Sequence, residues 1–251
     1  MRAVFLADAH LRRPEDRNYR ELLAFLADLE GKTDILFILG DLFEFLIGYP
    51  PRDFPHYRPL LDALMRVKQR GTRIVYFEGN HDFHLGSYFT ETLGAELHPG
   101  PAVMDLDGKR ILICHGDQIT RGELSLRLLR ALFHGPIVKA LIPVVPVEVT
   151  CFIADRLGRR SRAGRTKKKR PVDTRASLIR GYAAEWFQKG CTAVLTGHFH
   201  LPFLERSNND SQTLISLGEW ITQFSYAEYL DGTFTLKSYT PLSASIPNSS
   251  R

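Results

Sequence analysis

Short apolar runs alternate with segments of helical spacing over the first 80 residues of the chain. Three of the runs have the composition of buried strands: AVFLAD at 3–8, DILFILGD at 34–41 and TRIVYFEGN at 72–80. Two segments between them, 15–31 and 57–71, repeat apolar residues at helical spacing, and each ends at a glycine. Because strands and helices alternate, the pattern favours a parallel sheet with crossover helices.

The pattern changes twice beyond residue 100. The run 102–117 predicts a hairpin that turns at Asp107-Gly108, and a mostly helical region follows from 120 to 188. Strand-like runs resume at 191–200, 212–220, 224–230 and 232–239. We therefore predict one α/β domain over 1–240, a two-sheet sandwich flanked by helices (αββα). It carries a helical cap insertion at about 120–173, and the Ser/Pro/Asn-rich tail 241–251 is expected to be disordered.

The positive charge of the chain is concentrated in one segment. Residues 155–170 contain nine Lys or Arg and one Asp, a net charge of +8, whereas the whole chain carries +5, which leaves −3 elsewhere. Such a segment favours a phosphate-bearing partner: an anionic membrane surface, a phosphorylated substrate or a nucleic acid. A solvated loop without a specific partner accounts for the charge equally well when the segment is taken alone.

Composition and cysteine usage bear on the compartment. Apolar residues make up 44% of the chain and charged residues 24%, as in ordinary globular proteins. The first residues lack the pattern of a signal peptide, and no apolar run reaches the length of a membrane span. The three cysteines are far apart and fit neither a disulfide framework nor a zinc knuckle. We expect a cytoplasmic protein.

Polar side chains recur where the predicted strands end. They are Asp8, His10, Asp41, Asn80, His81, His115, His198 and His200. One such motif alone is more often a turn, but five in order, each at a strand end, indicate a site, because α/β folds gather their ligands at the carboxyl ends of strands. Imidazoles, carboxylates and an amide oxygen suit Mn²⁺, Fe²⁺ or Zn²⁺.

A paired metal site of this kind suits phosphoryl transfer. A carboxylate such as Asp41 can bridge two ions about 3.5–4 Å apart. A hydroxide held between the ions would attack phosphorus in line, and the ions would neutralise the charge that builds on oxygen. We therefore expect two divalent ions, Mn²⁺ first, and a hydrolase that cleaves a phosphoester or pyrophosphate bond.

The motifs D-x-H, G-D, G-N-H-D, H-G-D and G-H-x-H, complete and in order from residue 8 to 200, resemble the calcineurin-like metallophosphoesterase superfamily. The resemblance implies a metallophosphoesterase sandwich and two metals that share Asp41. One metal would be held by Asp8, His10, Asp41 and His200, and the other by Asp41, Asn80, His115 and His198. It further implies that His81, oriented by Asp82, contacts the phosphoryl oxygen or protonates the leaving group.

Longer motifs resemble one branch, the UDP-2,3-diacylglucosamine pyrophosphatases of lipid A biosynthesis. They are DAHL, FILGDLFEFLIG, GNHDFHLG, RILICHGD, TGHFHLPFL and SLGEW. The resemblance implies hydrolysis of the substrate to UMP and 2,3-diacylglucosamine 1-phosphate, by a protein peripheral on the cytoplasmic face of the inner membrane. The chain departs from that branch at His81, where Arg is usual, and at Leu126 and Gly158. Four residues of the basic segment are candidates to supply substrate contacts: Arg159, Arg160, Ser161 and Arg162.

Three alternatives to a lipid substrate stay open on the sequence. Another phosphodiesterase or phosphatase, acting on nucleotides or phosphoproteins, would share the whole metal site and differ in the cap. A non-catalytic scaffold would show lost ligands, and none is lost here. A nucleic-acid role rests on the basic segment alone, which makes it the weakest of the three. The apolar run 124–146 beside that segment favours acyl chains and an anionic membrane surface, or simply packs the cap.

Overall fold

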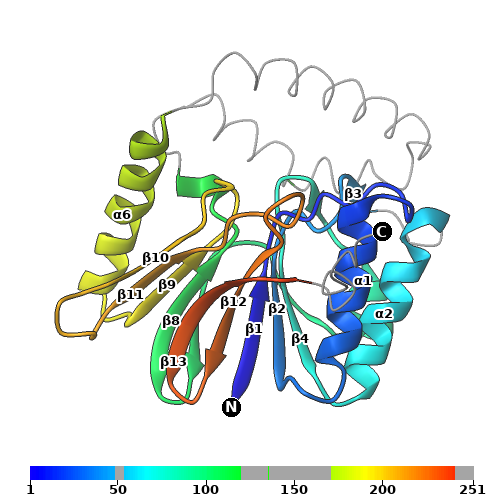
Figure 1. Cartoon of the computed structure of the whole chain (residues 1–251), viewed down its shortest axis with the longest axis horizontal. Coiled ribbons are helices and arrows are strands. Elements are labelled where there is room, and N and C mark those ends of the chain that lie inside the picture. Colours follow the sequence, from blue (N-terminus) through cyan, green and yellow to red (C-terminus); the bar gives the residue numbers. More distant parts are fainter. Residues whose placement is uncertain (49–53, 120–134, 136–170, 241–251) are drawn as a thin grey trace, which may run out of the picture.

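Two β-sheets lie face to face between helices in the computed structural model of the chain (Figure 1). The structure describes residues 1–48, 54–119, 135 and 171–240. The predicted insertion at 120–173 lies outside these residues except for 135 and 171–173, and the predicted tail at 241–251 lies outside them entirely. Across the described residues, the predicted α/β architecture with sheets covered by helices is confirmed.

The first sheet contains six strands in the order β13-β12-β1-β2-β4-β6. Their bounds are β1 (Arg2–Leu6), β2 (Ile35–Leu39), β4 (Arg73–Phe77), β6 (Glu96–His98), β12 (Ser225–Leu230) and β13 (Thr233–Ser238). Strands β1, β2, β4 and β6 are parallel, whereas β12 runs antiparallel to β1 and β13 antiparallel to β12. Strand β1 is therefore paired on both sides, with β2 and with β12.

The second sheet contains five strands in the order β10-β11-β9-β8-β7. Their bounds are β7 (Ala102–Leu106), β8 (Lys109–Cys114), β9 (Ala193–Thr196), β10 (Phe203–Arg206) and β11 (Thr213–Ser216). Strands β8, β9 and β11 are parallel. The predicted hairpin is confirmed as β7 and β8, and its turn residues Asp107 and Gly108 have φ of 52° and 76°, as a type I′ turn requires.

Helices cover the outer faces of both sheets (Figure 1). Helices α1 (Arg17–Leu29) and α2 (Arg58–Gln69) lie on the first sheet, and α6 (Val172–Gln188) lies on the second. Glycines that follow α1 and α2, Gly31 and Gly71, have φ of 68° and 98°, which ends each helix in a left-handed residue. Helix α1 buries Leu22, Phe25, Leu26 and Leu29, whereas Leu23 is only partly buried.

Short elements connect the strands and helices of these layers. They are β3 (Leu46–Ile47), β5 (Asp82–Phe83), the 3-10 turns Pro55–Tyr57 and Asp117–Ile119, and the π-helical turn Tyr88–Thr92. Strands β3 and β5 pair in parallel, so the loop after β2 is tied to the loop after β4.

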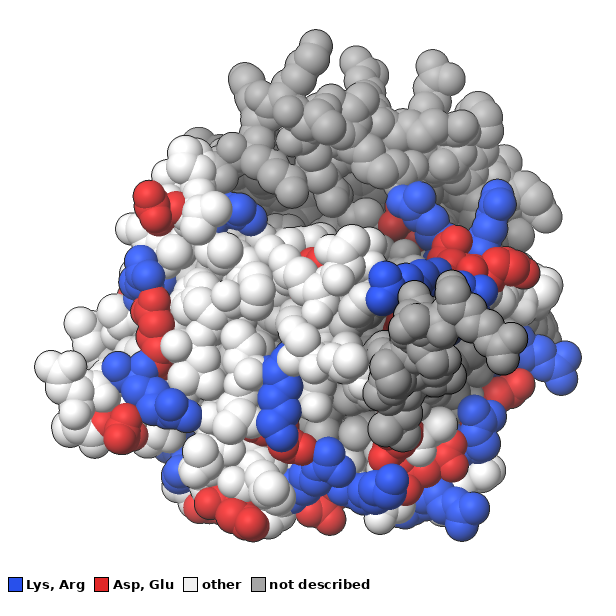
Figure 2. All heavy atoms as spheres, viewed as in Figure 1, with Lys and Arg blue, Asp and Glu red and all other residues white. Residues whose placement is uncertain are grey.

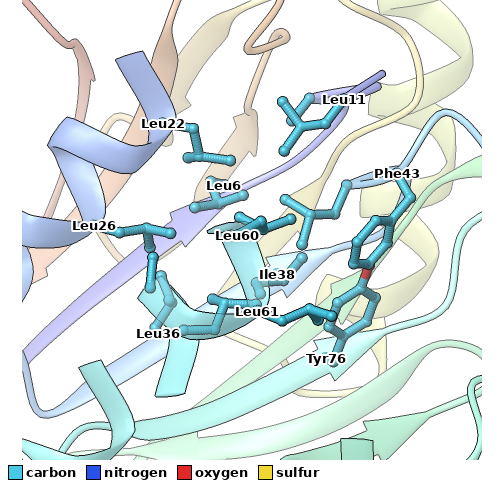
Figure 3. Packing of buried hydrophobic residues seen from close by; sticks show 14 of the residues in the cluster. Leu6, Leu11, Leu22, Leu26, Leu36, Ile38, Phe43, Leu60, Leu61 and Tyr76 are labelled. Atoms are coloured by element: carbon cyan, nitrogen blue, oxygen red, sulfur yellow. The ribbon is translucent and has the colours of Figure 1, made fainter. Parts of the chain in front are cut away.

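Two apolar layers hold the first sheet in place. Inside the sandwich, Phe5 of β1 stacks on Phe37 of β2, with ring centroids 4.5 Å apart, against buried residues of the second sheet. On the outer face, side chains of α1 and α2 pack on β1, β2 and β4 (Figure 3). Burial of each large side chain contributes about 1.5–3 kcal/mol, so the strand ends that follow are fixed by well-packed cores on both faces.

Positive and negative side chains alternate on the described part of the face in Figure 2. Oppositely charged side chains also pair among the described residues: Arg2 and Lys237 with Glu228, and Arg180 with Glu205. The described part of this face therefore carries no field of a single sign, in line with the mildly acidic balance expected outside 155–170.

Candidate metal centre

Side chains from both sheets meet at the edge where their parallel strands end. Residues Asp8 and His10 follow β1, Asp41 follows β2, Asn80 and His81 follow β4, His115 follows β8, and His198 and His200 follow β9. The two sheets face each other with these ends on the same side, so residues far apart in sequence become neighbours. The structure thus brings together the eight residues that the strand-end pattern singles out.

One group consists of Asp8, His10 and His200, whose ligand atoms lie within 4.8 Å of one another. The Oδ1 atom of Asp8 lies 3.4 Å from Nε2 of His200 and 3.9 Å from Nε2 of His10. Asp8 is fully buried and His10 is 8% exposed. The other oxygen of Asp8, Oδ2, accepts a hydrogen bond from the backbone N–H of His198, so Oδ1 is left to face the two imidazoles.

A second group consists of Asp41, His115 and His198, again within 4.8 Å. Nε2 of His115 lies 3.2 Å from Nδ1 of His198 and 3.1 Å from Oδ1 of Asn80. Nδ1 of His115 lies 2.7 Å from the backbone oxygen of Leu39, to which it can donate. With a proton on Nδ1, the neutral ring has its electron pair on Nε2, the nitrogen that lies beside Asn80 and His198.

Asp41 lies between the two groups. Its Oδ2 atom is 3.6 Å from Nε2 of His10 and 3.5 Å from Nε2 of His115, so one oxygen faces an imidazole of each group. Its Oδ1 atom accepts a hydrogen bond from the backbone N–H of His81 at 2.9 Å. This geometry supports the expected role of Asp41 as a carboxylate shared by two ions.

The backbone at the site is unusual in a way that the sequence did not reveal. Five of the predicted ligands have left-handed φ: Asp8 (54°), His10 (45°), Asp41 (53°), His198 (66°) and His200 (51°). The left-handed conformation of a non-glycine residue costs about 1–3 kcal/mol, and it persists only where the surrounding structure enforces it. The cores described above supply that enforcement, and the sharp turns point successive side chains into one space.

Two buried atoms test whether a metal fits. The Oδ1 atom of Asp8 and the Nε2 atom of His10 are buried and make no hydrogen bond to any described residue. An unpaired buried carboxylate oxygen is costly, and both atoms point into the cluster. Carboxylate oxygens, imidazole nitrogens and one amide oxygen are donors for Mn²⁺, Fe²⁺ or Zn²⁺. The residues therefore fit a pair of divalent ions.

The charges of the cluster point the same way. Burial alone would raise the pKa of both carboxyl groups, yet neighbouring imidazoles, His200 beside Asp8 and His115 beside Asp41, hold their pKa values below the ordinary range. Burial lowers the pKa of His115, but the Asp41 and Asp8 charges outweigh it and raise that pKa to about 9. Burial and the nearby His115 lower the pKa of His198 to about 4. The buried carboxylates therefore attract positive charge, which a metal cation supplies in place of the proton.

Asp82 holds the loops of the site rather than the imidazole that we expected it to orient. Its fully buried carboxylate accepts hydrogen bonds from five donors: the backbone N–H groups of Asp41, Leu42, Phe43 and Gly79, and the hydroxyl of Tyr76. Burial, and then the Asp41 charge, raise the pKa of Asp82 to about 7. The prediction that Asp82 orients His81 is wrong because loop N–H groups occupy its oxygens.

His81 is held by a different contact. Its Nδ1 atom lies 2.9 Å from the backbone oxygen of Glu44, and its ring stands edge-on to His10, with centroids 4.7 Å apart. The backbone carbonyl thus favours the proton on Nδ1. The side chain is half-buried beside the first group, and no described contact makes it one of the Asp41-bridged ligands.

The sequence did not reveal the residues that support the backbone of Asp8 and His200, the first and last of the expected ligands. The backbone N–H of Trp220 donates to the carbonyl of Asp8 at 3.1 Å, and the Gln223 amide donates to the carbonyl of His200 at 3.5 Å. The carboxylate of Glu219 accepts from the backbone N–H groups of Thr222 and Gln223, which closes this loop. The motif SLGEW was the available signal, although nothing in it indicated which residues it contacts. The hydroxyl of Tyr76 gave no signal, since it lies in an apolar strand.

Gly79 permits the close approach of two loops, which gives a first test of the site. A Cβ atom at Gly79 would lie 2.2 Å from Oδ1 and 2.5 Å from the backbone nitrogen of Asp41. We expect Gly79→Ala to push Asp41 out of place and to lower turnover about 100-fold, as a misplacement of about 1 Å does. Metal content per chain, measured by mass spectrometry of the dialysed protein, should also fall.

Gly86 offers a matched control for that substitution. It lies in the same region of the chain, its φ is not positive, and no described residue beyond its two chain neighbours comes within 4 Å of an added Cβ. Gly86→Ala should therefore leave turnover and metal content unchanged. Equal activity of the Gly79→Ala and Gly86→Ala variants would contradict the close packing described for Asp41.

The candidate substrate residues of the basic segment, Arg159, Arg160, Ser161 and Arg162, lie outside the described residues, as do Leu126 and Gly158. Their part in the site stays a prediction.

Buried carboxylates and imidazoles at the facing ends of two packed sheets define a metal-dependent hydrolase of the α/β sandwich class. Residues 1–202 match the family described as calcineurin-like phosphoesterase. The chain belongs to that family.

Relatives with assigned names match most of the chain. UDP-2,3-diacylglucosamine hydrolase of Photorhabdus laumondii is 31% identical over 246 residues, which cover 95% of this chain and 99% of that protein. The protein of the same name from Escherichia coli O81 is 31% identical over 230 residues, 89% of this chain and 92% of its own. Among solved structures, an archaeal phosphodiesterase aligns over 94% of this chain and 99% of its own, with 12% identity and a TM-score of 0.46.

Proposed function

We propose that this metal-dependent hydrolase cleaves the pyrophosphate bond of UDP-2,3-diacylglucosamine and releases UMP and 2,3-diacylglucosamine 1-phosphate. The observation that supports it most is the similarity to proteins named UDP-2,3-diacylglucosamine hydrolase, which runs over 95% of the chain and 99% of the relative. The cluster of Asp8, Asp41, His115 and their neighbours supplies the chemistry that such a cleavage needs.

The residues divide into two tasks. Asp8, His10, Asp41 and His200 would hold one divalent ion, and Asp41, Asn80, His115 and His198 the other. Bound there, the ions would supply positive charge to phosphate oxygens and lower the pKa of water. Asp41 would be a ligand of both ions, and the left-handed turns place the remaining ligand side chains around the same space.

His81 is proposed to act on the substrate rather than on the metals. Its ring lies beside the cluster, with Nδ1 directed at the carbonyl of Glu44, so Nε2 is the nitrogen left for a phosphoryl oxygen or for the leaving group. An imidazole so placed can donate a hydrogen bond or a proton. Arg at this position, usual in the lipid A branch, would donate a hydrogen bond but could not shuttle a proton.

His81→Ala separates these tasks. Because only the backbone N–H of His81 binds Asp41, the substitution keeps that hydrogen bond and should keep both metal equivalents. We expect turnover to fall about 100-fold, the lower range for loss of a general acid or base. Turnover is followed as product release at saturating Mn²⁺, and metal content by mass spectrometry. Loss of one metal equivalent in this variant would instead make His81 a ligand.

The proposed reaction is tested by the identity of the products. Purified protein, depleted of metal and supplied with Mn²⁺, is incubated with UDP-2,3-diacylglucosamine, and the nucleotide released is identified by chromatography. We expect UMP, and no turnover after chelation with EDTA until Mn²⁺ is restored. Release of UDP would contradict cleavage within the pyrophosphate. No release from this substrate, together with turnover of soluble phosphodiesters or nucleotides, would favour another substrate of the same metal centre.

The membrane surface is part of the proposal, because the substrate carries two acyl chains. Within the described ranges, no helix combines the length and the apolar character needed to cross a bilayer. Attachment would depend on residues 120–170, whose sequence joins an apolar run to nine basic residues in 155–170. Sedimentation with vesicles that contain anionic phospholipid, compared with neutral vesicles, tests this part. Duplex DNA serves as the competing polyanion.

A further inference from the structure

Glu44 contacts His10 of the cluster at Nδ1, and it is not among the expected metal ligands. It follows the G-D motif in the loop after β2, and its side chain is 21% exposed. Its Oε2 atom lies 3.5 Å from Nδ1 of His10, and its Oε1 atom accepts a hydrogen bond from Nη2 of Arg12 at 2.8 Å. Three side chains thus form a row from the surface to the cluster: Arg12, Glu44 and His10.

The backbone keeps this row in register. Residues 10–11 and 41–44 run alongside each other: the N–H of Leu11 donates to the carbonyl of Leu42 at 3.0 Å, and the N–H of Glu44 donates back to the carbonyl of Leu11 at 3.0 Å. Leu11 and Phe43 form a parallel bridge and are fully buried. Glu44 and His10 are therefore held opposite each other by two buried neighbours and not by their side chains alone.

The contact bears on which nitrogen of His10 carries the proton. A neutral imidazole has one N–H, and a carboxylate beside Nδ1 stabilises the form with the proton on Nδ1. The lone pair is then on Nε2, which is buried, makes no hydrogen bond to a described residue, and faces Asp8 at 3.9 Å and Asp41 at 3.6 Å. That is the nitrogen that a metal between these carboxylates requires.

A metal ion held by Glu44 itself is the competing interpretation. His10, Glu44 and His81 do place ligand atoms within 4.8 Å of one another. The guanidinium of Arg12, however, already lies 2.8 Å from the carboxylate, and its charge would repel a cation there. His10 would also have to bind that ion through Nδ1, the nitrogen beside Glu44, or turn its ring so that Nε2 leaves Asp8 and Asp41. The contacts favour an orienting role.

We infer that Glu44 is a positioning residue for the ion expected at Asp8, His10 and His200, and that Arg12 fixes Glu44 in turn. The inference rests on the proposed metal centre. It assigns a task to the acidic residue that follows Leu42 and Phe43 in the loop, and it concerns one of the two ions only, because no described contact links Glu44 to His115 or His198.

Calorimetric titration of metal-depleted protein with Mn²⁺ tests the inference. The wild type should bind two equivalents. In Glu44→Ala, one equivalent should bind about 10- to 100-fold more weakly, the usual effect of removing a partner of a metal-bound imidazole, and the other should be unchanged. Glu44→Gln keeps an oxygen that can accept from Nδ1 and preserves the volume, so its loss should be under about 10-fold. It also serves if the alanine variant fails to fold.

Glu205→Ala is the matched control. Glu205, in β10, likewise accepts hydrogen bonds from an arginine, Arg180 of α6, but it belongs to none of the metal-ligand groups. It should bind two equivalents as the wild type does. Arg12→Ala, which removes the arginine partner and keeps the Glu44 carboxylate, should weaken the same single equivalent as Glu44→Ala, but less.

Three results would overturn the inference. Unchanged binding of both equivalents in Glu44→Ala would show that His10 needs no partner on Nδ1. Equal weakening of both equivalents would show a general disturbance of the loop. If the wild type binds three equivalents of Mn²⁺ and Glu44→Ala binds two, Glu44 is itself a ligand. A wild type that binds no Mn²⁺ would overturn the proposed function as well. Failure of the inference on Glu44 alone would leave two equivalents bound to the wild type, so the two failures can be distinguished.

Discussion

Replacement of Asp41 by Asn should lower turnover at least about 100- to 1000-fold while the chain stays folded. One oxygen of Asp41, Oδ2, faces an imidazole of each group at 3.5 and 3.6 Å, so the substitution removes the single negative charge common to both expected ions. Loss of one well-placed electrostatic contact commonly has an effect of this size. The asparagine can still accept the hydrogen bond from the N–H of His81, which preserves the loop.

The measurement combines product release at saturating Mn²⁺ with metal content and thermal unfolding by circular dichroism. Glu228→Gln is a suitable control, because Glu228 is also a buried carboxylate, 4% exposed, but pairs with Arg2 and Lys237 away from the cluster. It should retain both metal equivalents and full turnover, whatever its effect on stability. An Asp41→Asn variant that binds two ions and turns over at the wild-type rate would exclude the bridging role.

Replacement of Asp82 should act on stability before it acts on chemistry. Five donors converge on this buried carboxylate, four of them from the loops that carry Asp41 and Asn80. In Asp82→Asn the amide nitrogen must face some of these donors, which leaves them unpaired. Each buried unpaired group costs about 1–3 kcal/mol, so we expect the free energy of unfolding to fall by about 3 kcal/mol or more.

A graded comparison makes this prediction specific. Tyr76→Phe removes only one of the five donors and should cost about 1 kcal/mol, the net value of one hydrogen bond. Urea unfolding followed by circular dichroism gives both values, and metal titration shows whether the loops still present Asp41. An Asp82→Asn variant as stable as Tyr76→Phe would show that the carboxylate is not the support described here.

The sequence allowed the cluster to be predicted because its residues follow strands that are simple to recognise. Asp8, Asp41 and Asn80 each follow a run of apolar residues that reads as a buried strand, and parallel strands end at one edge. The hairpin at Asp107-Gly108 was predicted for the same reason, since its turn chemistry is local. Strand ends and the hairpin turn could be predicted because they depend on residues adjacent in the sequence.

Features that depend on the meeting of distant segments could not be predicted. Nothing in FSYAEYL (224–230) indicates that β12 joins the first sheet beside β1, whereas β10 and β11 join the second. The burial of Asp82 among loop N–H groups likewise needs the β2 and β4 loops in place. Even the left-handed φ of Asp8 and His10 is imposed by surroundings, since isolated Asp and His residues rarely adopt it. His81 was assigned the wrong support because sequence adjacency to Asp82 is not contact.

The pairing of β1 on both sides sets an order of events during folding of the protein. The strand before Asp8 gains its second neighbour only with β12, and the Oδ2 atom of Asp8 is held by the backbone N–H of His198, 190 residues later. A chain that lacks β12 therefore has acidic and imidazole side chains without the sheet that positions them. Segments that pair over such separations form late. Metal binding should accordingly be one of the last steps of folding, because the ligands are not aimed at one space until β12 and the loop of His198 are in place.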